Sequence, residues 1–215
     1  MKRILVTGSG GIGGVNFVRA LKLFQDEFFI VGTDFNKYYL QFADLDQRVI
    51  SPRHSDPTFI SLLNKLTEQH KIEFLHPQPS SEALIVSQNL DKISAKTLLP
   101  SPNIISNDKL ETQKILSTSG IAVAKTKTID NYDLIASAFD ELGGGPLWIR
   151  AKNGAGGNLS LLCDNSSEAE YWMKLWILRK KANFNDFMIQ QYLPKRNIAW
   201  DSFWYDGKLI SSFTR

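Results

Sequence analysis

The amino-acid sequence predicts an α/β protein, with a doubly wound parallel sheet in its first half and an α+β unit in its second. Residues 3–7 form a short apolar run, residues 8–14 are rich in glycine, and residues 15–24 carry apolar residues at helical spacing. A second apolar run, residues 28–33, ends at Asp34. Strand, glycine turn, helix and strand in this order are typical of the start of a doubly wound sheet.

Helices and strands continue to alternate through the rest of the first half. The pattern predicts a helix over residues 57–69, a strand over 72–75 and a helix over 81–90. Residues 98–107 carry two prolines and several polar residues, so they indicate a connection between two folding units. We therefore predict a first domain over residues 1–100 and a second over residues 101–215.

The second half predicts an α+β unit with antiparallel strands. A capping box at Asp108 and Glu111 indicates a helix that ends near Gly120. The elements predicted after it are a strand over 123–129, a helix over 132–142, strands over 146–151 and 159–163, a helix over 168–181, and strands over 187–192, 198–204 and 208–213. The two strands before the long helix are joined by a short loop, so we expect them to form a hairpin.

The composition is that of an ordinary soluble globular protein. The chain has 215 residues, of which 43% are hydrophobic and 22% charged, and its net charge is only +3. This balance gives no reason to expect a nucleic-acid partner. Cys163 is the only cysteine, so a disulfide framework and a cysteine zinc site are excluded. No apolar run is long enough for a signal peptide or a membrane span, and we expect a cytoplasmic protein without a membrane partner.

An apolar strand that ends in cations runs directly into a glycine loop at residues 146–160. Arg150 and Lys152 close the strand. The loop holds three glycines: Gly154, Gly156 and Gly157. Glycines let backbone N–H groups approach an anion, and a guanidinium can bind two phosphate oxygens at once. The pattern predicts a polyphosphate clamp in which the loop is a flap over a nucleotide; a plain glycine-rich hairpin with basic flanks is the alternative.

Three motifs in this order resemble those of the ATP-grasp superfamily, and most of all those of the large subunit of carbamoyl-phosphate synthase. They are Asp108-Lys109, the strand and glycine loop at 148–157, and the segment 188–194. The resemblance covers nearly the whole chain. It implies a Rossmann-like, parallel-sheet pre-ATP-grasp domain over residues 1–100. It also implies a truncated ATP-grasp domain over residues 101–215, made of the small subdomain and the start of the large one.

The same resemblance implies an ATP site. Lys109 and Arg150 stand where the family has cations that contact the phosphates, and Gln190 stands where a side chain accepts from the adenine amino group. The backbone of the following hinge would contact the adenine edge, and Asn197 takes the place of an acid that binds the ribose. The implied set is Lys109, Arg150, Lys152, Gly154, Gly156, Gly157, Gln190, Gln191, Leu193 and Asn197.

The resemblance further implies an ATP-dependent carboxylate–amine ligase. Such an enzyme converts a carboxylate to an acyl phosphate, which an amine or similar nucleophile attacks. The acid, the nucleophile and the oligomeric state stay open, and no catalytic residue is assigned. The family holds magnesium through carboxylates beyond the point where this sequence ends, at Arg215. We therefore predict no metal ligands here and expect magnesium only in a full-length form. A nucleotide-binding module without turnover is an alternative.

A second glycine motif allows another interpretation. Gly8, Gly11 and Gly14 fit the turn of short-chain dehydrogenases, and Asp34 stands where an acid would bind the ribose of NAD. Those enzymes share a Tyr-x-x-x-Lys pair, and none of the 6 tyrosines has a lysine four positions on. We therefore expect a structural or substrate-facing turn, with an NAD-dependent oxidoreductase as the alternative. The segment 76–82 is a weaker candidate for a substrate contact, since an ordinary loop with a helix cap also explains it.

Overall fold

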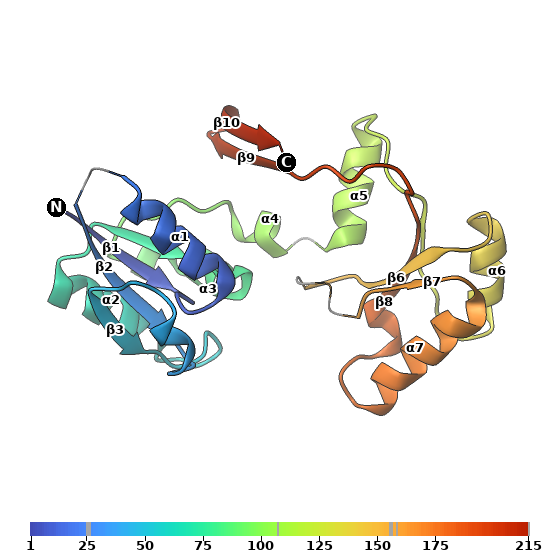
Figure 1. Ribbon diagram of the computed structural model, residues 1–215, viewed down its shortest axis with the longest axis horizontal. Helices are drawn as coiled ribbons and strands as arrows, with labels where there is room; N and C mark the ends of the chain where they lie inside the picture. Colours follow the sequence, from blue (N-terminus) through green and yellow to red (C-terminus); the bar gives the residue numbers. More distant parts are fainter. Residues whose placement is uncertain (25–26, 107, 155–156, 158, 215) are drawn as a thin grey trace. The chain divides into compact units, whose positions relative to one another are not determined.

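The computed structural model describes residues 1–24, 27–106, 108–154, 157 and 159–214. The chain divides into two compact units, Met1–Asn107 and Asp108–Arg215 (Figure 1). The first unit contains a parallel sheet and the second an antiparallel one. The predicted fold class is therefore confirmed.

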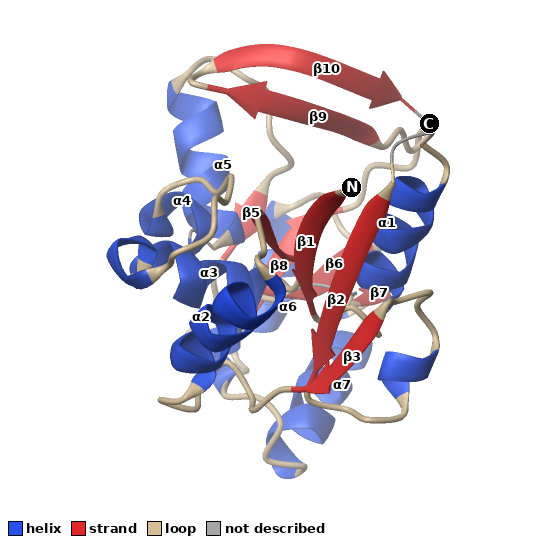
Figure 2. Cartoon of the chain, turned by 90° about the vertical axis from the view of Figure 1, so that its left-hand side faces the viewer, coloured by secondary structure: helices blue, strands red, loops and turns tan. Residues whose placement is uncertain are grey.

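The first unit is built around a four-stranded sheet in the order β3-β2-β1-β4, in which every neighbouring pair is parallel (Figure 2). Its elements are β1 (Lys2–Thr7), α1 (Ile12–Lys22), β2 (Phe28–Asp34), η1 (Tyr39–Gln41), β3 (Gln47–Ile50), α2 (Phe59–His70), β4 (Phe74–Pro77), α3 (Ser80–Gln88), η2 (Leu90–Lys92) and α4 (Pro102–Ser106). The strands β2 and β3 lie on one side of β1 and β4 lies on the other, which is the arrangement of a doubly wound sheet.

Both faces of this sheet are buried. Successive residues of β1 point to opposite faces, so Leu5 packs with Phe59 of α2 while Ile4 and Val6 pack with Val18 of α1. Figure 2 shows α1 on one side of the sheet and α2 with α3 on the other. Continuous apolar strands are expected when helices cover both faces.

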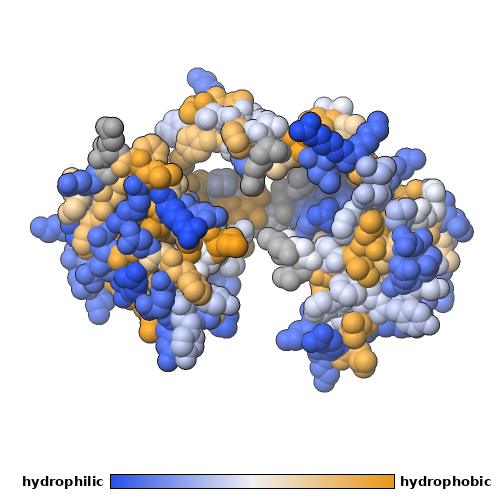
Figure 3. Space-filling model, in the orientation of Figure 1, coloured by the Kyte–Doolittle hydropathy of each residue, from blue (hydrophilic) through white to orange (hydrophobic). Residues whose placement is uncertain are grey.

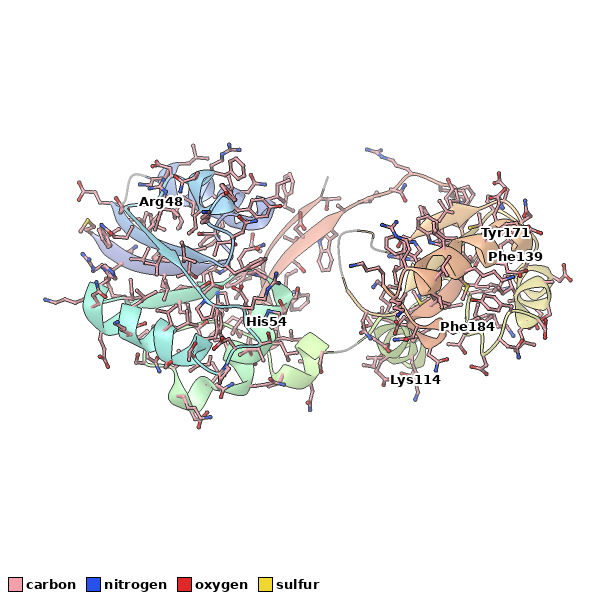
Figure 4. The ribbon with its side chains drawn as sticks, turned by 90° about the horizontal axis from the view of Figure 1, so that it is seen from below. Arg48, His54, Lys114, Phe139, Tyr171 and Phe184 are labelled. Carbon is pink, nitrogen blue, oxygen red and sulfur yellow. The ribbon has the colours of Figure 1, made fainter. Side chains whose placement is uncertain are left out.

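A single arginine closes the connection between β2 and β3. The guanidinium of Arg48, labelled in Figure 4, donates to the carbonyls of Leu40 at 3.2 Å, Ala43 at 2.8 Å and Leu45 at 3.0 Å. These three residues are buried in the core beside α1. The arginine thus satisfies backbone acceptors that the core withdraws from water.

Two expectations for the first unit are wrong in detail. The helix begins at Ile12 rather than at Val15, so the glycine segment includes the first turn of α1. The strand β3 is missing from the sequence prediction, because it has only 4 residues, two polar and then two apolar, which show no alternation. Edge strands of this kind carry a weak sequence signal, since only one of their faces contacts the core.

The glycines of the segment 8–14 lie very close to other parts of the first unit. A Cβ added to Gly10 would lie 2.3 Å from the backbone of Tyr39, one on Gly13 would lie 1.8 Å from the amide of Gln78, and one on Gly8 would lie 2.2 Å from Pro79. No real Cβ contact is as short as these. The backbone of Tyr39 and the ring of Pro79 therefore account for glycine at positions 10 and 8, whereas the flexible side chain of Gln78 can move away from position 13.

The second unit contains a four-stranded antiparallel sheet in the order β5-β8-β6-β7. Its elements are α5 (Lys109–Thr118), β5 (Thr126–Lys127), α6 (Leu134–Glu141), β6 (Leu147–Ala151), β7 (Leu161–Cys163), α7 (Ser166–Leu178), η3 (Phe184–Asp186), β8 (Phe187–Gln191), β9 (Trp200–Tyr205) and β10 (Lys208–Thr214). The predicted hairpin of β6 with β7 is confirmed. The carboxylate of Asp108 accepts from the backbone N–H of Glu111 at 2.8 Å, which confirms the predicted start of α5.

One face of this sheet packs on α6 and α7. Leu147 and Ile149 of β6 join a buried cluster with Phe139 and Met173, and Phe184 packs against it (Figure 4). Figure 1 shows α7 on one side of the sheet and α5 on the other. Because side chains alternate along a strand, Arg150 points to the face opposite this core.

The strands β9 and β10 form a separate antiparallel hairpin. Trp200 and Trp204 lie edge to face, with ring centroids 6.4 Å apart. Large apolar side chains are exposed along the whole hairpin (Figure 3): Trp200, Phe203, Trp204, Tyr205, Leu209, Ile210 and Phe213. Among the helices in the described ranges, none has the length and apolar character needed to cross a bilayer.

Substitution by alanine should change the free energy of unfolding differently at the adjacent positions Gly10 and Gly11. Gly10→Ala should lower the free energy of unfolding by about 1–3 kcal/mol, because the new methyl group must displace the backbone of Tyr39. Gly11→Ala is the matched control, because its nearest neighbour would be an oxygen at 3.4 Å and only the helix cap changes. It should cost about 0.5 kcal/mol. Urea unfolding measures both; equal effects would contradict the packing role of Gly10.

Candidate functional site

Two cations, Lys109 and Arg150, lie close enough to interact where β6 ends, and Arg150 points away from α6 and α7. The backbone N–H of Lys109, the first residue of α5, donates to the carbonyl of Lys152 at 3.0 Å. Its ammonium group donates to the same carbonyl at 3.3 Å and to the carbonyl of Gly154 at 2.9 Å. The structure therefore brings the Lys109 side chain next to the backbone of Lys152 and Gly154 and near Arg150.

Like charges meet in this cluster. Burial and then the charge of Arg150 lower the pKa of Lys109, and the carboxylate of Asp108 opposes them more weakly. In the part of the chain that the structure describes, neither Lys109 nor Arg150 forms an ion pair with a carboxylate. Two half-buried cations without an acidic partner favour an anion between them. Phosphate, which accepts several hydrogen bonds at once, fits this arrangement.

The guanidinium of Arg150 is held by a neutral side chain. Its Nη1 donates to the Oε1 atom of Gln190 on the neighbouring strand β8 at 2.8 Å. The Nε2 atom of Gln190 donates to the hydroxyl of Thr126 on β5 at 3.2 Å. Gln190 is only 6% exposed. In this structure the amide oxygen that the family resemblance assigns to the adenine amino group accepts from Arg150.

The glycine loop next to these cations contrasts with the turn of the first unit. Gly154 and Gly157 have positive φ angles of 90° and 71°, which other residues rarely adopt. Among the described residues, and apart from the chain neighbours, no heavy atom lies within 4 Å of a Cβ added at either position. The described residues thus leave this space open, whereas the space beside Gly10 is filled. Gly156, the third predicted glycine, lies outside the described residues.

The far side of the loop is fixed to helix α7. Leu159 has a positive φ of 60°, and its carbonyl accepts from the indole N–H of Trp172 at 3.1 Å. Positive φ is costly for a leucine, so the packing around it must compensate. Trp172 also packs edge to face with Trp176, with ring centroids 5.6 Å apart.

The predicted hinge residues after Gln190 are either paired in the sheet or exposed. The backbone N–H of Gln191 donates to the carbonyl of Lys125 at 2.8 Å, so this group is used in the sheet. Leu193 is 57% exposed and Asn197 is exposed as well; both lie in the segment that follows β8. Their roles toward adenine and ribose stay predictions.

Thr126 is the site residue that sequence reasoning missed. It lies in β5, a strand of only 2 residues, and reaches Gln190 through the pairing of β5 with β8. Only this pairing relates the two positions, and no local pattern indicates it.

The residues of the alternative NAD motif form hydrogen bonds within the first unit. One carboxylate oxygen of Asp34 accepts from the backbone N–H of Gly10 at 3.2 Å, and the other accepts from that of Asn36 at 2.8 Å. With the glycines packed against Tyr39, Gln78 and Pro79, these contacts support a structural role for the turn. A pocket of about 530 Å³ lies beside it, lined by α1 and η1 with mainly apolar side chains.

The weaker candidate segment at residues 76–82 is packed inside the first unit. The imidazole of His76 stacks on Phe17 with ring centroids 3.8 Å apart, and burial lowers its pKa. Burial raises the pKa of the Glu82 carboxyl group. Among the residues that the structure describes, no group of three or more His, Cys, Asp or Glu side chains could hold a metal ion.

Neither a protein-family model nor a curated protein sequence matches the chain. Solved structures do. Carboxyaminoimidazole ribonucleotide synthase from Aspergillus clavatus, complexed with ATP, matches with a TM-score of 0.69 at 14% identity, over 99% of this chain and 53% of that chain. N5-carboxyaminoimidazole synthetase from Staphylococcus aureus, complexed with ADP, gives 0.66 at 16% identity, over 93% and 49%. Biotin carboxylase from Campylobacter jejuni gives 0.62 at 18% identity, over 93% and 46%.

These solved structures are ATP-grasp enzymes, and the chain spans about half of their length. At such low identities the likeness concerns the fold, and it confirms the predicted resemblance to the superfamily at that level. The chain therefore has an ATP-grasp fold, with a parallel-sheet unit followed by an antiparallel one.

Proposed function

We propose that this chain is the ATP-binding portion of an ATP-grasp carboxylate–amine ligase. The observation that carries the proposal is the cluster of Lys109 and Arg150, two cations without a carboxylate partner beside an open glycine loop. Solved structures of the same fold include complexes with ATP and with ADP, which supports a nucleotide as the ligand.

Each residue of the cluster has a chemical role in this proposal. The guanidinium of Arg150 keeps its full charge, because its partner Gln190 is neutral, and its free N–H groups donate to phosphate oxygens. The ammonium of Lys109 leaves the carbonyls of Lys152 and Gly154 and donates to the same phosphates. Together the cations neutralise charge on the polyphosphate and hold it in one orientation.

The chemical step is proposed for a full-length form. In a full-length form we expect ATP to activate a carboxylate as an acyl phosphate, which an amine or similar nucleophile then attacks. The finer resemblance to the large subunit of carbamoyl-phosphate synthase is part of this proposal, and the acid and the nucleophile stay open. The family resemblance leads us to expect magnesium only in that full-length form, and this expectation is part of the proposal.

Removing the strand-end cation should weaken ATP binding selectively. Arg150→Met should raise the Kd for ATP about 10- to 100-fold, because hydrogen bonds to a charged group are each worth about 1.5–3 kcal/mol. Lys109→Met should raise it about tenfold. Calorimetric titration with ATP measures both variants.

A lysine on the same helix provides the control. Lys114 is exposed on α5, so Lys114→Met should leave the Kd for ATP within about twofold of its original value. Titration with NAD tests the alternative function. ATP binding that survives Arg150→Met unchanged would contradict the phosphate clamp, and binding of NAD without ATP would favour an oxidoreductase.

The affinity for inorganic tripolyphosphate should depend on the charge of Lys109. In the free chain the pKa of Lys109 is below its usual value, and a bound polyanion raises it by favouring the ammonium form. Affinity should therefore be full below the pKa of the free chain and fall as pH rises through that value. Titrations from about pH 7 to about pH 10 should show this decrease at a lower pH than an ordinary lysine would give. Lys109→Met should remove this decrease in affinity. The same pH dependence in Lys109→Met would refute the phosphate contact of Lys109.

A further inference from the structure

The hydrogen bonds around Gln190 fix which way its amide points. The carbonyl oxygen of Ala124 can only accept, so the hydroxyl of Thr126, 3.1 Å away, donates to it. With its proton used there, the hydroxyl must accept from Gln190, and the atom that faces it at 3.2 Å is the NH₂ group of the amide. The amide oxygen is thereby turned toward Arg150.

The hydrogen bond between Arg150 and Gln190 requires the same orientation of the amide. A guanidinium carries donors only, so Arg150 requires an acceptor, and the Oε1 atom of Gln190 lies 2.8 Å from its Nη1. A flipped amide would place donor against donor at Arg150 and leave Thr126 without a donor. The four groups thus form a single polarised chain from Ala124 through Thr126 and Gln190 to Arg150, across the strands β5, β8 and β6.

Burial makes this chain of bonds strong. Gln190 is 6% exposed, and Thr126 and Arg150 are half-buried, so water competes weakly for their hydrogen bonds. The guanidinium is also held without being neutralised, because the acceptor is an amide and not a carboxylate. Arg150 is fixed in direction while its charge stays available to an anion.

We propose that Gln190 is a positioning residue for the phosphate-binding Arg150, and that Thr126 sets the orientation of Gln190. This inference rests on the proposed function, since it assumes that Arg150 binds phosphate. It differs from the role that the family resemblance implies for Gln190, in which the amide oxygen accepts from the adenine amino group. The two roles predict that a substitution of Gln190 weakens the binding of different ligands.

Phosphate and adenine contributions separate when ATP, inorganic tripolyphosphate and adenosine are titrated in turn. Gln190→Met has a similar length and lacks the acceptor, so Arg150 loses its support. The Kd values for ATP and for tripolyphosphate should each rise about tenfold, while that for adenosine should stay within about twofold. Gln190→Glu keeps an acceptor toward Arg150 but adds a carboxylate that offsets its charge, so both Kd values should stay raised about tenfold.

Thr126 offers a matched pair of variants away from the phosphate. Thr126→Val removes the hydroxyl at nearly constant shape and should raise the Kd for tripolyphosphate about threefold, because the amide of Gln190 loses one of its two orienting bonds. Thr126→Ser keeps the hydroxyl and should match the original chain. Thermal unfolding followed by circular dichroism checks that each variant is folded, and the Thr126 pair tests the proposal even if Gln190→Met fails to fold.

The outcomes separate this inference from the proposed function. If the original chain binds neither ATP nor tripolyphosphate, both are wrong. If it binds both and Gln190→Met weakens ATP and adenosine by equal factors, the positioning role alone is wrong and Gln190 contacts adenine. If Thr126→Val and Thr126→Ser bind tripolyphosphate equally, the orienting role of Thr126 is wrong.

Discussion

The antiparallel pairing of β6 with β8 is the constraint on which the second unit depends. It places Ile149 opposite Ile189 in the core and Trp148 opposite Gln190 on the other face. Because side chains alternate along a strand, a shift of one residue would bury Arg150 against α7 and expose Ile149. The same pairing therefore builds the core and directs the cation to the candidate site. Its register is well specified, since a buried guanidinium without a partner would be very costly.

Glycine serves two different purposes in the two units. At Gly10 and Gly14 the backbone itself occupies the space that a side chain would need, and the glycines let the start of α1 approach neighbouring segments. At Gly154 and Gly157 the described residues leave the space open, and the backbone angles have positive φ. Glycine motifs that look alike in a sequence can thus be enclosed by packing in one place and lie in an open loop in another.

The electrostatic character of the site comes from what surrounds its cations. Lys109 donates to carbonyl oxygens and Arg150 to an amide oxygen, so both are hydrogen-bonded without being neutralised. Neutral acceptors satisfy the donors of a half-buried cation and leave its field largely intact. An anion such as polyphosphate gains from this field, whereas an ion pair with a carboxylate would have cancelled it.

Local patterns in the sequence determined much of this protein. Alternating strands and helices predicted the parallel sheet, and Asp108 predicted the start of α5. The order of cations and glycines at the end of β6 predicts a phosphate site, which stays a prediction. These features depend on neighbours a few positions apart, which is the range over which sequence patterns are informative. Only the tertiary structure decided the partner of Gln190, the part played by Thr126 and the crowding around Gly10. Each of these depends on strands or loops that are distant in the chain and meet through pairing or packing, and no local pattern records such a meeting.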